Sequence, residues 1–210
     1  LYHGVVREVR RMIEAGELGD VRYIYSQRLN LGRVRSDVDA LWNFAPHDVS
    51  ILQYWTGGAP PSKVTRSGKA FLQPGVEDVC FLSLEYPHGP LGHIHVSWLD
   101  PVRTRRMVVV GSRKMAVYDD VAEKKLAIHD KGVDVRAVLG EKMDYDLSGQ
   151  PPYAYKDGEV RWPHIPWEEP LKVQARHFLE CIRTGEEPLT GVGHAREVVA
   201  ILEFASQGQR

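Results

Sequence analysis

Apolar residues recur at helical spacing in several parts of the chain. One stripe covers residues 5–13 and is followed by Gly16, a residue that commonly ends helices. Similar stripes near the end of the chain predict two further helices, over 170–184 and about 193–206. Each of these helices has one apolar face, so we expect all of them to pack against a common layer.

Strand-forming residues alternate with polar ones over 21–29 and again in a series of short segments. Tight turns join these segments, which favours an antiparallel sheet over βαβ units. A short strand is also predicted around 159–162, within a proline-rich stretch of loops from 131 to 168. The segments of the series are 62–71, 77–86, 92–99, 105–111, 114–119 and 125–130.

These elements predict an α+β fold. We expect a largely antiparallel, open-faced sheet with the helices packed on one face. A chain of 210 residues is long enough for a self-sufficient core, and the length favours a single domain spanning 1–210.

A further helix is predicted to begin at Pro46, after a loop over 30–45, and to stop at Thr56. Proline suits the first helical position, because it has no N–H to lose there. His47 would then lie in the first turn, where the positive end of the helix disfavours the imidazolium. A neutral imidazole near neutral pH suits acid–base chemistry on a hydroxyl, although its position equally fits a polar cap.

Polar residues on the first strand lead toward this histidine. Arg28 and Asn30 share one face of the strand, because strand side chains repeat every two residues. Arg28 could hold a carboxylate or diphosphate in bidentate fashion, or lie in solvent at a strand edge. Trp42 either packs in the core or lines the pocket. Asp48 is expected to cap free N–H groups at the helix start.

A metal site is a remote alternative. His93 and His95 project from one face of a strand, an arrangement that binds zinc in some hydrolases. No third ligand follows at a recognisable spacing, and polar pairs on the solvent side of a sheet are common. We therefore expect no metal site.

Charge and cysteine content narrow the choice of partners. With 27 basic and 28 acidic residues the formal net charge is −1, which argues against nucleic acid or an acidic membrane as a partner. The short basic clusters at 103–106 and 124–125 are read as solvated faces. Two separated cysteines favour a reducing compartment. We see no signal peptide and no apolar run of about 18 residues, so we expect a cytoplasmic protein.

Several motifs carry a family resemblance. The run YSQRLNLGRVRSD at 25–37, continued by LWNFAPHD at 41–48, resembles the C-terminal domain of the glucose–fructose oxidoreductase, inositol dehydrogenase and MocA family. Matches at 96–101, 108–112 and 116–120 support it, so the resemblance covers nearly the whole chain. The nearest branch acts on nucleotide-linked amino sugars and uronic acids.

The resemblance implies a set of site residues. In the family, an acidic residue is followed four positions later by a histidine that helps to remove a proton from a sugar hydroxyl while hydride leaves for NAD or NADP. His47 matches the histidine, and the acidic position is Asn43. An amide cannot take the proton, but it can orient a hydroxyl through hydrogen bonds. With His47 as the catalytic residue, Arg28, Asn30, Trp42 and Asn43 are the expected substrate-binding residues.

The cofactor half of such an enzyme is missing from this sequence. No G-x-G-x-x-G lies between a strand and a helix, and the family's Glu-Lys-Pro segment is absent. The chain begins at Leu1, which suggests that residues once preceded it, so we expect the N-terminal Rossmann domain to be cut away or carried elsewhere. We expect no cofactor-binding residues here and no activity from this chain alone.

Two interpretations of function follow. The first is the substrate-binding and assembly domain of an NAD(P)-dependent oxidoreductase acting on a sugar or nucleotide-sugar. The second is a non-catalytic sugar-binding or oligomerisation module. The family pairs through its open sheet face, so in either case the resemblance implies a homodimer or tetramer.

Overall fold

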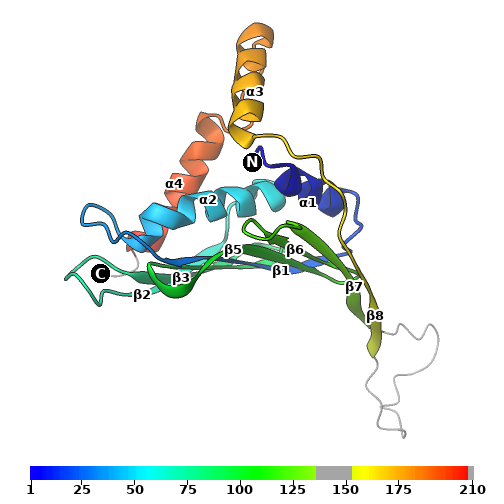
Figure 1. Ribbon diagram of the computed structural model, residues 1–210, viewed down its shortest axis with the longest axis horizontal. Coiled ribbons are helices and arrows are strands. Elements are labelled where there is room, and N and C mark those ends of the chain that lie inside the picture. Colours follow the sequence, from blue (N-terminus) through cyan, green and yellow to red (C-terminus); the bar gives the residue numbers. More distant parts are fainter. Residues whose placement is uncertain (136–152, 208–210) are drawn as a thin grey trace, which may run out of the picture.

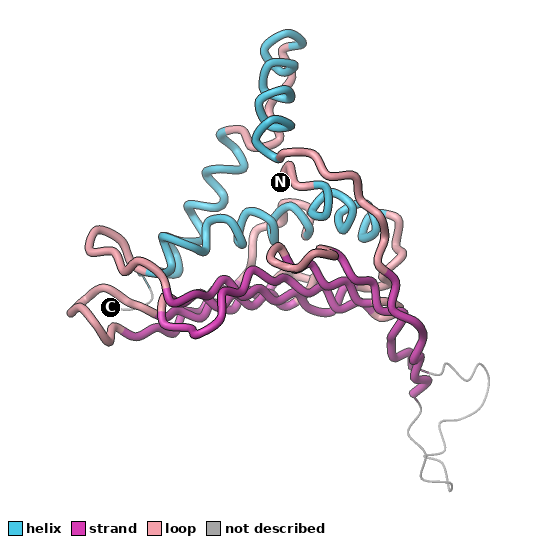
Figure 2. Tube along the Cα trace, in the orientation of Figure 1, coloured by secondary structure: helices cyan, strands magenta, loops and turns pink. Residues whose placement is uncertain are grey.

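The computed structural model describes residues 1–135 and 153–207. Within these residues, one sheet forms a single layer and every helix lies on the same side of it (Figures 1 and 2). The α+β fold with helices on one face of an open sheet is therefore confirmed. The elements are α1 (Gly4–Glu14), β1 (Val21–Leu31), α2 (Ala40–Trp55), β2 (Lys63–Lys69), β3 (Val79–Glu85), β4 (Leu91–Ser97), β5 (Leu99–Gly111), β6 (Met115–Asp119), β7 (Leu126–Val135), β8 (Tyr153–Arg161), α3 (Pro170–Thr184) and α4 (Val192–Gln207).

The sheet has the strand order β2-β3-β4-β1-β5-β6-β7-β8. Its neighbours pair antiparallel except β1 and β4, which run parallel with Tyr23 beside Leu91. This parallel pair was not predicted, because it joins segments that are far apart in the sequence and no local turn signal indicates it. The pairing places β1, which leads into α2, near the centre of the sheet.

The strand predicted around 159–162 is longer in the structure, where β8 begins at Tyr153. Its partner β7 extends to Val135, beyond the predicted limit. The rest of the loops expected between 131 and 168 includes residues 136–152, which lie outside the described residues.

Helix α2 begins earlier than predicted. It starts at Ala40, and the side chain of Asp39 caps it by accepting a hydrogen bond from the Trp42 backbone N–H at 2.8 Å. The expected loop over 30–45 is therefore wrong for its last six residues, and Pro46 lies inside the helix. An interior proline costs about 3 kcal/mol or more. Burial of side chains such as Leu41, which has no exposed area, opposes this cost.

The core lies between the helices and the sheet. Leu52 of α2 and Val9 of α1 are fully buried above sheet residues such as Ile94. The indole N–H of Trp55 donates to the Val6 carbonyl at 2.9 Å and ties α2 to α1. Helix α4 lies beside α2, whereas α3 stands away from the sheet (Figure 1). None of the helices in the described ranges is both long and apolar enough to cross a membrane.

Among the described residues, no element covers the sheet face opposite the helices (Figure 1), and this face is partly aromatic. Tyr23 stacks on Tyr25, with ring centroids 6.3 Å apart, and Phe81 stacks on His95 at 4.3 Å. Tyr23 is 43% exposed and Phe81 is 38% exposed. Val108 is paired with Tyr25 on this same face. Neither face of the sheet is therefore purely polar.

Candidate functional site

His47 lies well inside α2 rather than in its first turn. The prediction that the helix's positive end keeps this imidazole neutral is therefore wrong, because the dipole acts mainly within the terminal turn. The pKa of His47 is nevertheless lowered from its usual 6.5, first because surrounding protein partly desolvates the ring and then because the Arg28 guanidinium repels a proton. His47 is still exposed at the surface, so a ligand can reach a neutral imidazole.

A buried ion pair lies next to this histidine. Asp48 is only 1% exposed, and its Oδ2 accepts from Arg28 Nε at 2.6 Å. Its Oδ1 accepts from Arg28 Nη2 at 3.3 Å and from the Ser26 hydroxyl at 2.6 Å. Burial alone would lower the pKa of Arg28, but the Asp48 carboxylate outweighs it and the pKa is raised. The contact is bidentate and charge-assisted, the strong form of such a pair.

These contacts change the interpretation of two residues. Asp48 was expected to cap the start of the helix. That expectation is wrong, because the helix starts eight residues earlier, at Ala40, and Asp48 faces the sheet. Arg28 does grip a carboxylate in bidentate fashion, but the carboxylate belongs to the protein itself. Arg28 therefore holds α2 on β1 and brings a positive charge close to His47.

The other predicted site residues lie around this pair. Asn43 is four residues before His47 on α2, so the two side chains share one helix face. Asn30 follows Arg28 on the same face of β1, and its Oδ1 is buried without a hydrogen-bond partner among the described residues. An acceptor that is buried without a partner is energetically costly.

Trp42 faces another part of the molecule. Its indole N–H donates to the Ser206 hydroxyl of α4 at 3.3 Å, and it lines a cavity beside Arg66. Arg66 is 5% exposed by side chain and pairs with Asp39 at 2.7 Å and with Glu77 at 2.5 Å. Because Asp39 caps α2, this cluster fixes the start of the helix that carries Asn43 and His47. The structure therefore does not bring Trp42 to the Arg28–Asp48 pair.

Sequence reasoning missed a second charged cluster near the site. Asp120, at the end of β6, lies 3.5 Å from Arg105, 3.4 Å from Lys125 and 3.8 Å from His3 Nε2. Arg105 and Lys125 belong to the basic clusters read as solvated faces. That interpretation is wrong for Lys125, whose side chain is 28% exposed, whereas the Arg105 side chain is 41% exposed. The motif ending at Asp120 was noticed as a family match, but nothing in its residue types predicted these partners.

Asp120 and Tyr118 connect this cluster to the Arg28–Asp48 pair. Burial raises the pKa of Tyr118, and the charge of Asp120 raises it further. Both groups also contribute to the raised pKa of Arg28. Asp120 therefore acts electrostatically on Arg28 as well as on its close neighbour Lys125.

The strand-to-helix connections of the described residues lack the glycine-rich turn of a dinucleotide fold. Of the described strands, β1 and β8 are each followed by a helix. The first connection contains one glycine, Gly32, and the second contains none. The fingerprint turn of a dinucleotide fold has several glycines between a strand and a helix, so neither loop is such a turn.

In the structure, His93 and His95 contact neighbouring side chains on the sheet. His95 stacks on Phe81, and His93 Nδ1 lies 3.4 Å from the Ser83 hydroxyl. Among the described residues, no group of three or more His, Cys, Asp or Glu side chains is arranged to hold a metal ion.

Comparison with known proteins identifies the family of this domain. The family described as the GFO/IDH/MocA C-terminal domain matches residues 6–117, just over half of the chain. The chain belongs to this family. No curated protein sequence matches it. The family resemblance noted in the sequence is therefore confirmed at the level of the domain.

Solved structures share the fold. A Magnetospirillum magnetotacticum protein assigned as an oxidoreductase is 22% identical, with a TM-score of 0.75 over 97% of this chain and 60% of its own. The UDP-N-acetylglucosamine 3-dehydrogenase of Acidithiobacillus ferrooxidans is 18% identical, with a TM-score of 0.67 over 97% of this chain and 59% of its own.

An inositol dehydrogenase homologue from Azotobacter vinelandii, solved with NADH and myo-inositol, is 16% identical with a TM-score of 0.67, over 99% of this chain and 60% of its own. At these identities the likeness shows the fold. The chain spans about 60% of the length of the structures it matches.

Proposed function

We propose that this domain is the substrate-binding and assembly half of an NAD(P)-dependent oxidoreductase that oxidises a hydroxyl of a sugar or nucleotide-sugar. The observation that carries the proposal is the exposed His47, whose pKa is lowered, next to the buried Arg28–Asp48 pair. The family assignment and the sugar-oxidising proteins among the matched structures support it.

His47 is the proton acceptor in this proposal. A hydroxyl can lose its proton only to a group that is unprotonated at the working pH, and a lowered pKa keeps the imidazole in that form. Arg28 contributes through its charge and through the position of α2. Asn43 orients the hydroxyl from the same helix face, and Asn30 Oδ1 accepts from another hydroxyl of the sugar.

The oxidant belongs to another domain in this proposal. NAD or NADP would supply the hydride acceptor, and a dinucleotide-binding domain would hold it. The exposed apolar surface of α3 supports such a covering domain. Leu171, Phe178, Leu179 and Ile182 recur at helical spacing and are 55–72% exposed. An unpaired apolar stripe of this kind marks an interaction surface.

The bare sheet face supports self-association. Tyr23, Tyr25, Phe81 and Val108 lie on that face, opposite the helices. An extended, partly aromatic surface without a covering layer is typical of an interface. We propose that two copies pair through this face as a homodimer, or as a tetramer built from such dimers.

The test compares the isolated chain with a complete enzyme. We expect the 210-residue chain alone to show no saturable binding in a titration followed by nicotinamide fluorescence. We expect a longer gene product that includes a dinucleotide-binding domain to reduce NAD or NADP when a sugar or nucleotide-sugar is added. Saturable micromolar binding of the nicotinamide cofactor to the isolated chain would contradict the proposal that another domain holds the cofactor. A complete protein that binds sugars without oxidising them would favour the non-catalytic module.

A further inference from the structure

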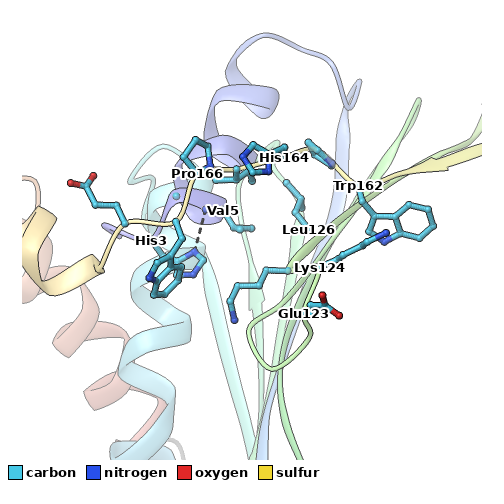
Figure 3. Close-up of a pocket in the computed structure, with 14 residues that line it drawn as sticks. His3, Val5, Glu123, Lys124, Leu126, Trp162, His164 and Pro166 are labelled. Carbon is cyan, nitrogen blue, oxygen red and sulfur yellow. Dashed lines mark hydrogen bonds between the residues drawn. The ribbon is translucent and has the colours of Figure 1, made fainter.

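A cavity of about 440 Å³ lies between the start of α1, the turn between β6 and β7, and the segment from Trp162 to Trp167 (Figure 3). Its volume falls within the range of small-molecule sites, roughly 300–1,000 Å³. The proposed proton transfer does not use this cavity. Its lining combines indole rings, lysines and the end of a helix, which together specify a kind of ligand.

The aromatic side chains of the lining are unusually exposed. Trp162 is 52% exposed and Trp167 is 64% exposed. Lys124 Nζ lies 5.1 Å from the ring centroid of Trp162, and Lys125 Nζ lies 6.0 Å from that of Trp167. Each indole therefore has a cation near one face and a large exposed area, the arrangement on which a planar ring stacks.

The same cavity favours an anion. Helix α1 begins at its wall, where His3 caps the helix and accepts from the Val5 N–H at 3.2 Å. The positive end of a helix and the Lys124 ammonium attract negative charge. Lys125 also lines the cavity, and its ammonium is paired with Asp120 at 3.4 Å. Glu123 and Glu168 also line the cavity, but Arg176 neutralises Glu168 at 2.6 Å.

Close packing builds this wall. A Cβ added at Gly4 would lie 2.9 Å from the Ile165 Cγ2 atom, so the absence of a side chain at this position lets the segment after β8 approach the start of α1. That approach brings Trp167 to His3, with ring centroids 5.5 Å apart and nearly edge to face.

The cavity connects with the candidate site through His3 and Lys125. His3 Nε2 is buried, lies 3.8 Å from Asp120 and makes no hydrogen bond within the described residues. Its ring lies 5.3 Å from that of Tyr118. A ligand held in the cavity therefore lies beside two residues, His3 and Lys125, that are both close to Asp120.

We propose that this cavity binds the nucleoside diphosphate part of a substrate whose sugar lies at His47. The base stacks on the indole of Trp162 or Trp167. The diphosphate lies against Lys124, Lys125 and the N-terminus of α1. This inference rests on the proposed function and narrows its substrate class to nucleotide-linked sugars.

The experiment is calorimetric titration of the 210-residue chain with UDP, inorganic diphosphate, uridine and NADH. We expect UDP to bind saturably, and diphosphate and uridine each to bind at least about tenfold more weakly, since both parts contribute. Replacing the stacking tryptophan by alanine should weaken the binding of UDP at least about fivefold. Trp162→Ala and Trp167→Ala are each compared with the matching phenylalanine variant, which keeps a ring.

Lys124→Ala should weaken UDP binding severalfold, and Lys63→Ala on the distant edge strand β2 is its matched control. The proposal is overturned if UDP binds no tighter than diphosphate or if neither tryptophan variant alters UDP affinity. It is also overturned if NADH displaces UDP, because the cavity would then serve the cofactor.

The two proposals fail separately. His47→Gln should leave UDP affinity unchanged while it reduces the activity of a complete enzyme. A complete enzyme that oxidises free sugars, with no UDP binding to this chain, would overturn the cavity assignment and leave the proposed function standing. UDP binding to this chain, together with a complete enzyme that oxidises no sugar, would overturn the proposed function and leave the cavity assignment standing.

Discussion

Replacing Arg28 by methionine tests how the buried ion pair supports the site. Methionine keeps an unbranched apolar side chain between β1 and α2 but removes the charge. Asp48 would then be left almost fully buried, with the Ser26 hydroxyl as its remaining side-chain partner. Removing one member of a buried pair costs roughly 3–5 kcal/mol, and the 18% exposure of the Arg28 side chain points to the lower end.

A loss of about 3 kcal/mol is readily measurable. With a urea m-value of about 2 kcal/mol per M, the unfolding midpoint should fall by about 1.5 M. Asp48→Asn combined with Arg28→Met should restore part of the loss, because neither charge is then left unpaired. Arg35→Met is the matched control, since Arg35 also pairs with an aspartate, Asp37, but at the exposed surface. We expect that control to leave the midpoint essentially unchanged.

The same variant should change the titration of His47. Arg28 lowers the pKa of His47 and Asp48 raises it, so removing Arg28 leaves the carboxylate effective and the pKa rises. Histidine NMR titrations of parent and variant measure this shift. An unchanged His47 pKa, or a midpoint that falls no more than that of the Arg35 control, would refute the reasoning.

Three further predictions follow from the bare surfaces and from the histidines. Phe81→Asp on the open sheet face, where Phe81 is 38% exposed, should convert a dimer to a monomer in sedimentation velocity, whereas a parent that stays near 23.8 kDa as its concentration rises would exclude the dimer. Leu179→Glu should barely change the stability of the isolated chain, because Leu179 is 66% exposed; a loss as large as that of Leu202→Ala would mean that α3 is already packed. Burial lowers the pKa of both His3 and His47 below 6.5, so the unfolded chain binds protons first and the unfolding free energy should fall as the pH drops through about 6.5. Chemical denaturation at pH 5.5 and 7.5 measures this, and equal stability at both would contradict it.

Periodicity and turn chemistry predicted most of the fold. The stripe over 5–13 and the short strands from 62 to 119 occur close to where they were expected, because each is recorded locally in alternating or helical spacing. The start of α2 could not be predicted in this way. Pro46 is a strong local signal for a helix beginning, and burial of distant residues overrides it.

The candidate site was predictable only in part. The resemblance identified His47 and Asn43, and strand alternation placed Arg28 and Asn30 on one face. The pairing of Arg28 with Asp48 depends on how α2 crosses β1, which no local pattern records. The charges gathered at Asp120 were missed for the same reason, since their partners come from β5, from the turn before β7 and from the start of the chain.

The most direct test of the proposed function is the rate of a complete enzyme in which His47 is replaced. We expect His47→Gln to lower kcat/KM by about 10²–10⁴ while leaving the unfolding midpoint and UDP affinity unchanged. In the parent, kcat/KM should rise through a pKa below 6.5 and then level off, and this rise should be lost in the variant. A variant that keeps kcat/KM within a few-fold of the parent would show that His47 does not carry the proton.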